Sequence, residues 1–278
     1  MVKSILLAAL SVVMNRLQPN VKPPTAPLSR QVEYSAQILE VEPTRPNYAW
    51  GVVQGALLAN AIGIPRISVL ELGVAGGNGL IALEKIAAKA AELCGVEIDV
   101  YGFDTGTGLP KPSDYRDLPN MFREGFFPMN VGELQKRLTT ARPILGDVKT
   151  TIPDFLSSAP APIAFVSFDL DLYTSTAQAL QLFEAHTDRL MPRIFCYFDD
   201  IMGFSYGDFN GERLAISEFN DSHTLRKLSK IYGMQWVVPA ICSPSCWIEQ
   251  FYMAHIFDHG LYGRYDGSNP RTRLDLGG

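Results

Sequence analysis

Short apolar segments alternate with longer segments of helical character through the middle of the chain. The short segments are rich in β-branched and aromatic residues, and the longer ones carry apolar residues at helical spacing. Strands are predicted at residues 68–72, 98–103, 143–145, 163–168 and 193–198, and helices at residues 80–93, 131–141 and 174–190.

This alternation predicts the fold class. Strands that are apolar along their length, separated by helices, are typical of a parallel sheet that helices cover on both faces. With 278 residues, of which 47% are hydrophobic, the chain is large enough to bury one core. We therefore expect one doubly wound α/β domain, and in such folds the ligand binds beyond the carboxyl ends of the strands.

The two ends of the chain differ from this central part. Residues 5–14 are almost wholly apolar and follow Lys3, but no small-x-small cleavage site follows and the run is too short to span a bilayer. A packed or partner-binding helix is favoured, with a signal peptide or an interfacial membrane anchor left open. Residues 18–30 hold four prolines and predict an extended linker. The domain is thus expected at residues 31–258, followed by a loosely ordered glycine-rich tail at 259–278.

Charge and cysteine content exclude some classes of function. The net charge is -5, with 24 basic and 29 acidic residues intermixed, so the chain lacks the positive field that nucleic acid binding needs. Among the four cysteines, Cys94 and Cys196 lie in apolar runs and no pair has CxxC spacing. A reduced, cytoplasmic protein is expected, while a disulfide between Cys242 and Cys246 stays open.

A glycine-rich turn follows the first predicted strand. Residues 71–79 read Glu-Leu-Gly-Val-Ala-Gly-Gly-Asn-Gly, in which Asn78 is predicted to cap the next helix. Asp104 ends the following strand, where a carboxylate can accept hydrogen bonds from ribose hydroxyls. Any tight strand-to-helix turn would use such glycines. The spacing here is not G-x-G-x-x-G, and Glu71 would repel a pyrophosphate, so both features count against a dinucleotide. The pattern favours a cationic ligand without phosphate, such as S-adenosylmethionine.

Four carboxylates follow two of the predicted strands. Asp169 and Asp171 come directly after one strand, and Asp199 and Asp200 follow the next. Neighbouring parallel strands lie ~4.8 Å apart, so these side chains should converge at one edge of the sheet. A hard divalent cation such as Mg²⁺ would offset their repulsion and lower the pKa of a bound substrate hydroxyl. The alternative for Asp171 is a capping role at the helix that begins near Thr174.

These segments resemble the macrocin O-methyltransferase family and the related sugar O-methyltransferases of macrolide and aminocoumarin pathways. The resemblance covers roughly residues 66–220. The matching residues are 71–74 with 76–77, 102–104 with 108–110, 169–173 with 175–176, and 199–200, with weaker matches at 151–153, 211–213 and 218–219.

The resemblance implies a Rossmann-like, seven-stranded class I methyltransferase sheet whose antiparallel last strand comes from residues 245–255. It also implies an S-adenosylmethionine-dependent, Mg²⁺-assisted O-methyltransferase in which Asp171 is the general base. The other implied roles are as follows: Asp169, Asp199 and Asp200 hold the metal; Glu71, Gly73, Val74, Gly77 and Asn78 hold the methionine part of the cofactor; and Asp104 with Thr105 lies at the ribose.

Other residues leave the function less defined. Asp147 is expected either near the adenine or in a surface turn. The apolar segment 112–130 fits a lid over a small hydroxylated substrate or a contact in a homo-oligomer. Residues 105–107 depart from the family pattern, which leaves the methyl acceptor open. A nicotinamide-dependent oxidoreductase and a catalytically silent binding protein of the same fold are the two rival functions.

Overall fold

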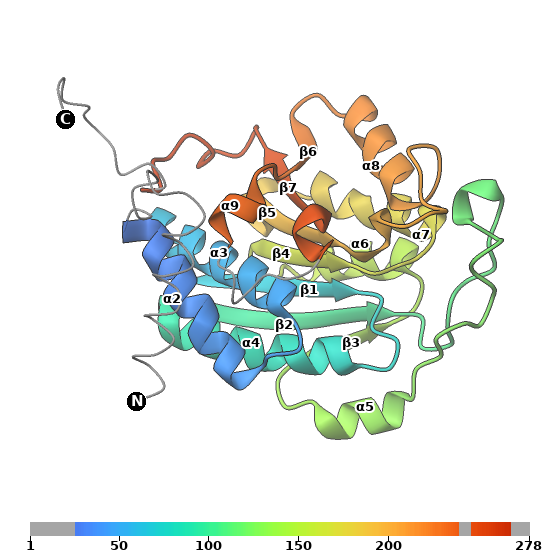
Figure 1. The fold of residues 1–278 in the computed structure, drawn as a ribbon, viewed down its shortest axis with the longest axis horizontal. Coiled ribbons are helices and arrows are strands. Elements are labelled where there is room, and N and C mark those ends of the chain that lie inside the picture. Colours follow the sequence, from blue (N-terminus) through green and yellow to red (C-terminus); the bar gives the residue numbers. More distant parts are fainter. Residues whose placement is uncertain (1–25, 239–245, 268–278) are drawn as a thin grey trace.

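A computed structural model describes residues 26–238 and 246–267 and contains one seven-stranded sheet (Figure 1). The strand order is β3-β2-β1-β4-β5-β7-β6, and β7 runs antiparallel to both of its neighbours. The doubly wound α/β sheet of the class I methyltransferase type, with its antiparallel last strand, is thereby confirmed. The strands are β1 Arg66–Leu72, β2 Glu97–Asp104, β3 Arg142–Leu145, β4 Ile163–Phe168, β5 Leu190–Phe198, β6 Arg226–Lys230 and β7 Phe251–Ile256.

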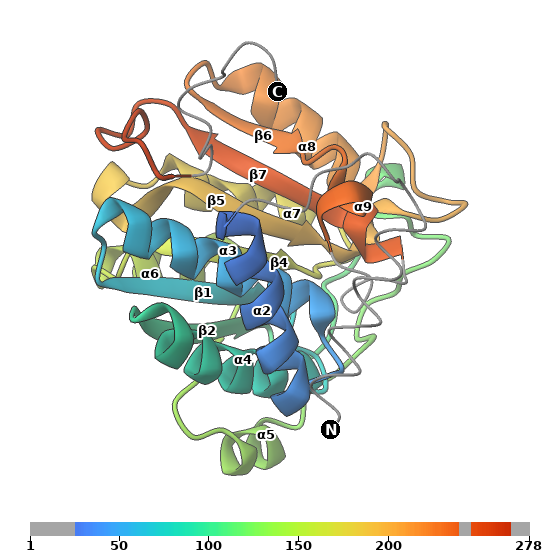
Figure 2. The same cartoon turned by 60° about the vertical axis from the view of Figure 1, so that its left-hand side comes forward.

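Helices cover both faces of the sheet. Helices α3 and α4 pack on one face, with α2 lying across them, and α6, α7 and α8 cover the other (Figures 1 and 2). The α-helices are α2 Ala26–Val41, α3 Pro46–Ile62, α4 Asn78–Cys94, α5 Val131–Arg137, α6 Val148–Ser157, α7 Tyr173–Ala179, α8 Gly211–Ser222 and α9 Met234–Val237. Short 3₁₀ helices are η1 Tyr115–Asp117, η2 Leu180–Glu184, η3 Thr187–Arg189, η4 Asp199–Ile201 and η5 Cys246–Gln250.

The central strand β1 is buried on both faces, as its apolar sequence predicts. Leu70 and Leu72 belong to the core cluster that includes residues of α6 and α7, whereas Val69 belongs to the cluster that includes α3 and α4. Side chains alternate along a strand, so Glu71 shares the face of Val69. Its carboxylate is therefore placed beneath α3 and away from the end of the strand.

The ends of the domain differ from the sequence-based expectation. Helix α2 begins at Ala26, within the segment predicted to be an extended linker. Pro27 does not prevent this because the first turn of a helix needs no N–H donor from proline. The start of the predicted loose tail is packed, since Arg193 forms a 2.6 Å ion pair with Asp266. Residues 5–14 and Cys242 lie outside the described residues.

Three local predictions were wrong. The helix predicted at 174–190 ends at Ala179 and continues as two 3₁₀ helices before β5. The helix predicted at 131–141 ends at Arg137, because Glu84 accepts the backbone N–H groups of residues 139–141. Asn78 is the first residue of α4 and not its cap; Gly77 takes the cap position without a side-chain hydrogen bond.

No helix within residues 26–238 and 246–267 is both long enough and apolar enough to cross a lipid bilayer.

Candidate functional site

The end of β1 lies against the end of β4 because residue 73 is a glycine. Gly73 has φ +89°, and a Cβ there would lie 1.7 Å from the carbonyl oxygen of Asp169. In addition, the N–H of Asp169 donates to the carbonyl of Leu72 at 2.8 Å. The glycine turn and the first acidic residue after β4 therefore meet at the carboxyl edge of the sheet.

Asp104 organises the glycine turn from the end of β2. Its Oδ2 accepts the N–H groups of Val74 and Ala75, both at 2.9 Å, and its Oδ1 accepts the N–H of Gly106 at 2.7 Å. A carboxylate has about four lone-pair positions, so one acceptor position remains for a ligand hydroxyl. Asp104 also lines the pocket described below, where it can meet such a hydroxyl.

Two further amides of the turn are occupied. The N–H of Gly73 donates to Phe103 O, and the N–H of Gly77 donates to Val74 O, both at 2.8 Å. Phosphate-binding turns direct several free N–H groups at the anion. Four N–H groups of this turn, those of residues 73, 74, 75 and 77, are therefore engaged within the protein.

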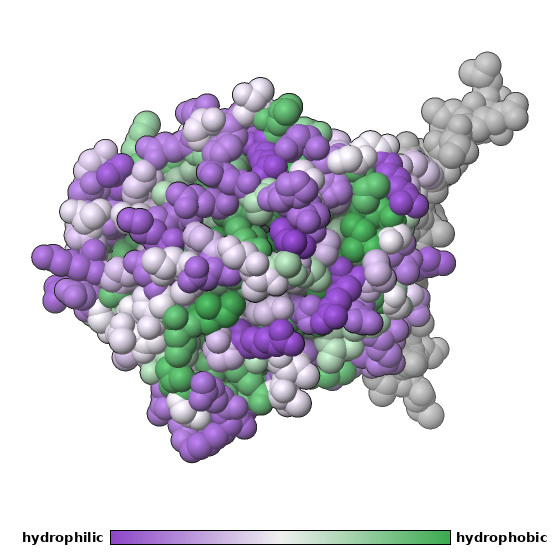
Figure 3. All heavy atoms as spheres, turned by 180° about the vertical axis from the view of Figure 1, so that it is seen from behind, coloured by the Kyte–Doolittle hydropathy of each residue, from purple (hydrophilic) through white to green (hydrophobic). Residues whose placement is uncertain are grey.

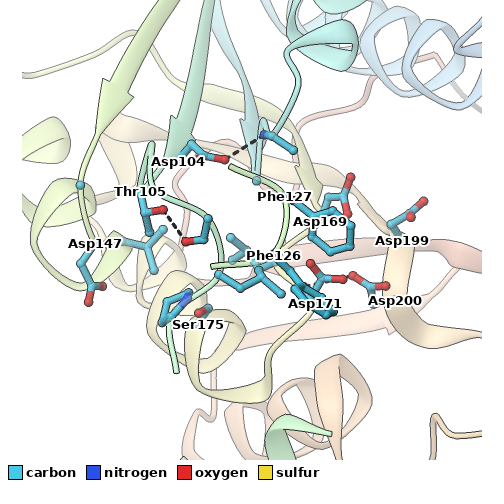
Figure 4. A pocket seen from close by; sticks show the side chains of 18 residues that line it. Asp104, Thr105, Phe126, Phe127, Asp147, Asp169, Asp171, Ser175, Asp199 and Asp200 are labelled. Carbon is cyan, nitrogen blue, oxygen red and sulfur yellow. Dashed lines mark hydrogen bonds between the residues drawn. The ribbon is translucent and has the colours of Figure 1, made fainter. Parts of the chain in front are cut away.

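A pocket of about 320 Å³ opens at this edge of the sheet (Figure 4). Six aspartates line it, and none of its lining residues in the described part of the chain is a lysine, arginine or histidine. The aspartates are Asp104, Asp147, Asp169, Asp171, Asp199 and Asp200. Such a lining favours a ligand that is positively charged or a bound cation.

The four carboxylates at the ends of β4 and β5 share this pocket, as the sequence predicted. Burial, followed by the charges of Asp199 and Asp200, raises the pKa of Asp169 to about 8. Burial and the charge of Asp200 raise the pKa of Asp171 to about 8, and burial with the charge of Asp199 raises that of Asp200 to about 6. The carboxylates lie close enough to oppose one another's ionisation.

Asp171 has an unusual backbone. Its φ of +61° lies in the left-handed region, which few residues other than glycine occupy. Its N–H donates to Oδ2 of Asp200 at 3.1 Å, and the two side chains lie next to each other in Figure 4. Asp171 does not cap the next helix, because Asp117 accepts the N–H of Thr174 there at 2.7 Å. The alternative interpretation of Asp171 as a helix cap was therefore wrong, and its strained backbone indicates a functional constraint.

Hydrogen bonds fix the second pair of carboxylates. Oδ1 of Asp200 accepts the hydroxyl of Tyr206 at 3.0 Å, and its N–H donates to Oε2 of the fully buried Glu212 at 3.0 Å. Oδ1 of Asp199 accepts the hydroxyl of Tyr197 at 2.7 Å. The Asp200 carboxylate thus accepts more hydrogen bonds than those of Asp169, Asp171 or Asp199.

The chemistry of these side chains suits a hard cation, although the carboxylates are not gathered around one point. All nearby donors are carboxylate oxygens, which Mg²⁺ prefers, and burial with mutual repulsion raises the pKa values of Asp169 and Asp171 although the charge of Arg45 acts to lower that of Asp169. Within the described residues, no three acidic, histidine or cysteine side chains stand at the distances of a formed metal site. Asp169 and Asp199 would have to turn toward Asp200 for the three carboxylates to share a cation.

The predicted cofactor residues fall into two groups. Gly73, Asp104, Thr105 and Asp147 line the pocket, whereas Glu71, Val74, Gly77 and Asn78 are not among its lining residues. Thr105 donates its hydroxyl to Gly108 O at 2.7 Å, and Asp147 caps α6 through the N–H of Lys149 at 2.8 Å. Figure 4 shows Asp147 well apart from the acids after β4 and β5.

Glu71 lies beneath the pocket in the core. It is 2% exposed, and burial raises its pKa to about 8. Its Oε1 accepts the hydroxyl of Tyr48 on α3 at 2.7 Å, and Tyr48 in turn accepts the hydroxyl of Ser167 at 3.1 Å. Its Oε2 has no partner within the described residues. This contact was not predicted from the sequence, because Tyr48 and Glu71 are 23 residues apart and no local pattern links them.

The apolar segment predicted as a lid or an oligomer contact lies beside the pocket. Phe126 and Phe127 line the pocket while remaining 40% and 52% exposed. Asp117, which is fully buried, anchors the segment by accepting hydrogen bonds from Ser113 and Thr174. On the face shown in Figure 3, hydrophobic residues form separate patches among hydrophilic ones.

Sequence comparison identifies no relatives: no protein-family model and no curated protein matches the chain. Among solved structures, the calicheamicin methyltransferase CalS11 is similar, with 20% identity over 84% of this chain and 94% of that chain and a TM-score of 0.49. The O-methyltransferase NovP has 18% identity over 62% and 70% of the two chains and a TM-score of 0.47.

TomG from Streptomyces achromogenes, an O-methyltransferase involved in tomaymycin synthesis, has 13% identity over 89% and 96% of the two chains and a TM-score of 0.38. Likenesses at this level do not define an activity, so the chemistry must be derived from the pocket itself.

Proposed function

We propose that this protein is an S-adenosylmethionine-dependent, divalent-cation-assisted O-methyltransferase that acts on a hydroxyl of a small molecule. The observation that carries the proposal is the acidic pocket at the end of the glycine turn. Six aspartates line it, without a basic side chain among its described lining residues, and four amides of the turn are engaged within the protein. This environment suits a cationic cofactor without phosphate.

The cofactor is assigned to the side of the pocket at β1 and β2. Asp104 has an acceptor position for a ribose hydroxyl, and Thr105 and Asp147 line the same side. S-adenosylmethionine supplies an electrophilic methyl group on a sulfonium, whose positive charge the surrounding carboxylates favour. Glu71 is included in this proposal because it lies beneath the glycine turn, where Tyr48 holds its buried carboxylate.

The metal is assigned to Asp169, Asp199 and Asp200. A divalent cation there would offset their mutual repulsion and lower the pKa of an acceptor hydroxyl. Asp171 is the proposed general base. Burial and the charge of Asp200 raise its pKa in the metal-free protein, and a cation held by Asp169 and Asp200 would lower it, which would leave the carboxylate free to accept a proton. The chain's own residues thus bind, orient and deprotonate the acceptor.

The rivals predict a different site. A nicotinamide-dependent oxidoreductase needs donors for a pyrophosphate, and the acidic lining, without a basic side chain among its described residues, opposes it. A catalytically silent protein would have no reason to keep a strained aspartate beside three further carboxylates. We propose that the catalytic domain, expected at residues 31–258, begins with α2 at Ala26 and extends to Asp266, and that the protein is cytoplasmic.

Product analysis tests the proposal. The purified protein is incubated with S-adenosylmethionine carrying a deuterated methyl group and a library of hydroxylated metabolites, with either MgCl₂ or EDTA. We expect a product heavier by one labelled methyl group, formed with Mg²⁺ and lost with EDTA. Equal product formation in EDTA would remove the metal role and leave the methyltransferase; labelling of amines or thiols only would contradict O-methylation.

A further inference from the structure

Tyr206 lies in the connection between η4 and α8 and contacts one acid of the pocket. Its hydroxyl donates to Oδ1 of Asp200 at 3.0 Å. Hydrogen bonds to a charged acceptor are stronger than those between neutral groups. Tyr206 was not among the residues predicted from the sequence, because an isolated tyrosine in a polar loop carries no recognisable spacing.

The ring of Tyr206 is held in place by its surroundings. It packs against the small apolar cluster formed by Leu118, Phe122 and Leu172. On another side it lies over Gly203, where a Cβ would stand 2.9 Å from the ring. Gly203 has φ +139°, a conformation that side-chain-bearing residues rarely adopt. Because this residue has no Cβ, it leaves room for the ring. The hydroxyl is therefore aimed by packing and does not depend on a freely rotating side chain.

The hydrogen bond completes the set that fixes Asp200. Its Oδ2 accepts the N–H of Asp171, and its own N–H donates to Glu212. Without the Tyr206 hydroxyl, the described contacts would hold only Oδ2 of the Asp200 carboxylate. The carboxylate could then turn about the Cβ–Cγ bond, which is a soft rotation for aspartate.

We propose that Tyr206 is a positioning residue, which holds the Asp200 carboxylate in the orientation needed to bind a divalent cation. The inference rests on the proposed function, in which Asp200 is a metal ligand. Tyr206 also connects Asp200 to the apolar segment through Leu118 and Phe122, so the carboxylate and the wall of the pocket are placed together.

Metal titration of the Tyr206→Phe variant tests this role. The variant keeps the ring and removes the hydroxyl alone, and Tyr101→Phe serves as a matched control because Tyr101 lies on β2 and its hydroxyl contacts Arg142. Mn²⁺ is titrated alone, with the bound fraction measured by electron paramagnetic resonance. Loss of an outer partner of a metal ligand weakens affinity about tenfold or more, so we expect Tyr206→Phe to bind about tenfold more weakly than wild type. Tyr101→Phe should match wild type.

Equal affinity of Tyr206→Phe and wild type, with Mn²⁺ bound by both, would overturn the positioning role. If wild type binds no Mn²⁺, the proposed metal site is excluded. A crystal structure of Tyr206→Phe then tests separately whether Tyr206 positions the Asp200 carboxylate. An Asp200 carboxylate turned away from its contact with the N–H of Asp171 supports the role; an unchanged carboxylate overturns it. Tm, measured alongside, separates both results from a general loss of folding.

Discussion

The backbone N–H of Asp171, after β4, donates a 3.1 Å hydrogen bond to the carboxylate of Asp200, after β5. The bond ties the ends of two adjacent parallel strands together at the edge where ligands bind in this class of sheet. It also holds Asp171 in a left-handed conformation that few residues other than glycine adopt. Two acids that repel one another are thus fixed side by side, in agreement with the roles proposed for Asp200 as a metal ligand and for Asp171 as the general base.

Replacing Asp199 with asparagine tests the metal role. Asp199→Asn removes one negative charge from the pocket while keeping the size of the side chain. We expect Mg²⁺-stimulated methyl transfer to fall at least a hundredfold, with S-adenosylmethionine affinity within about threefold of wild type. Transfer is measured by product mass and cofactor binding by calorimetry. Asp188→Asn, at the opposite end of β5 in η3, is the control and should retain wild-type transfer. Full turnover of Asp199→Asn would exclude this residue as a metal ligand.

Stability should depend on pH in a specific direction. Burial and like charges raise the pKa values of Asp169, Asp171 and Glu71 to about 8 and that of Asp200 to about 6. The folded protein therefore binds more protons than the unfolded chain between about pH 4 and 8, and the free energy of unfolding falls as pH rises through this range.

The measurement is Tm against pH. Without divalent ions, we expect Tm to be higher near pH 5 than near pH 8. Mg²⁺ should raise Tm more at pH 8 than at pH 5, because protons compete with the metal for the same carboxylates. A metal-free Tm that increases from pH 5 to 8 would contradict the mutual repulsion of these acids.

Neutralising Asp169 should stabilise the metal-free protein. Asp169→Asn removes a buried charge whose pKa is raised by burial and by its acidic neighbours. At pH 8, in EDTA, we expect Tm to increase by about 2 °C or more, and the response to Mg²⁺ to be lost. Differential scanning calorimetry measures both. The control is Asp221→Asn, an exposed position near the end of α8. Destabilisation by Asp169→Asn in EDTA would show that this carboxylate has a structural role.

Asp117 should be essential for placing the apolar segment. Its buried carboxylate accepts hydrogen bonds from the backbone and hydroxyl groups of Ser113 and Thr174. Asp117→Ala leaves these donors without their partner, at a cost of about 2 kcal/mol or more in the free energy of unfolding. We expect faster tryptic cleavage at Arg116 and Arg123, followed by mass spectrometry. The nearby exposed Asp114→Ala should be cleaved at a rate closer to wild type; equal rates for both variants would remove the anchoring role.

Periodic features were predictable from the sequence. The apolar runs at residues 163–168 and 193–198 correspond to central strands, and acids that follow adjacent parallel strands must meet at one edge. The convergence of Asp169, Asp171 and Asp200 follows from this geometry alone.

Contacts between segments far apart in the chain were not predictable. Tyr48 reaches Glu71 because α3 crosses the sheet face above it, and Asp117 reaches Thr174 across 57 residues. Neither contact has a local sequence pattern. The position of Glu71 is a further example: the glycine turn was recognised from sequence, but the alternation of β1 places this carboxylate in the core beneath α3, outside the lining of the pocket.

Calorimetric titration of wild-type protein with S-adenosylmethionine in the presence of Mg²⁺, compared with titration with NADH, tests the central claim most directly. The acidic lining of the pocket predicts that one molecule of S-adenosylmethionine binds per chain and that titration with NADH releases no heat. Saturable binding of NADH without binding of S-adenosylmethionine, or binding of neither, would contradict it.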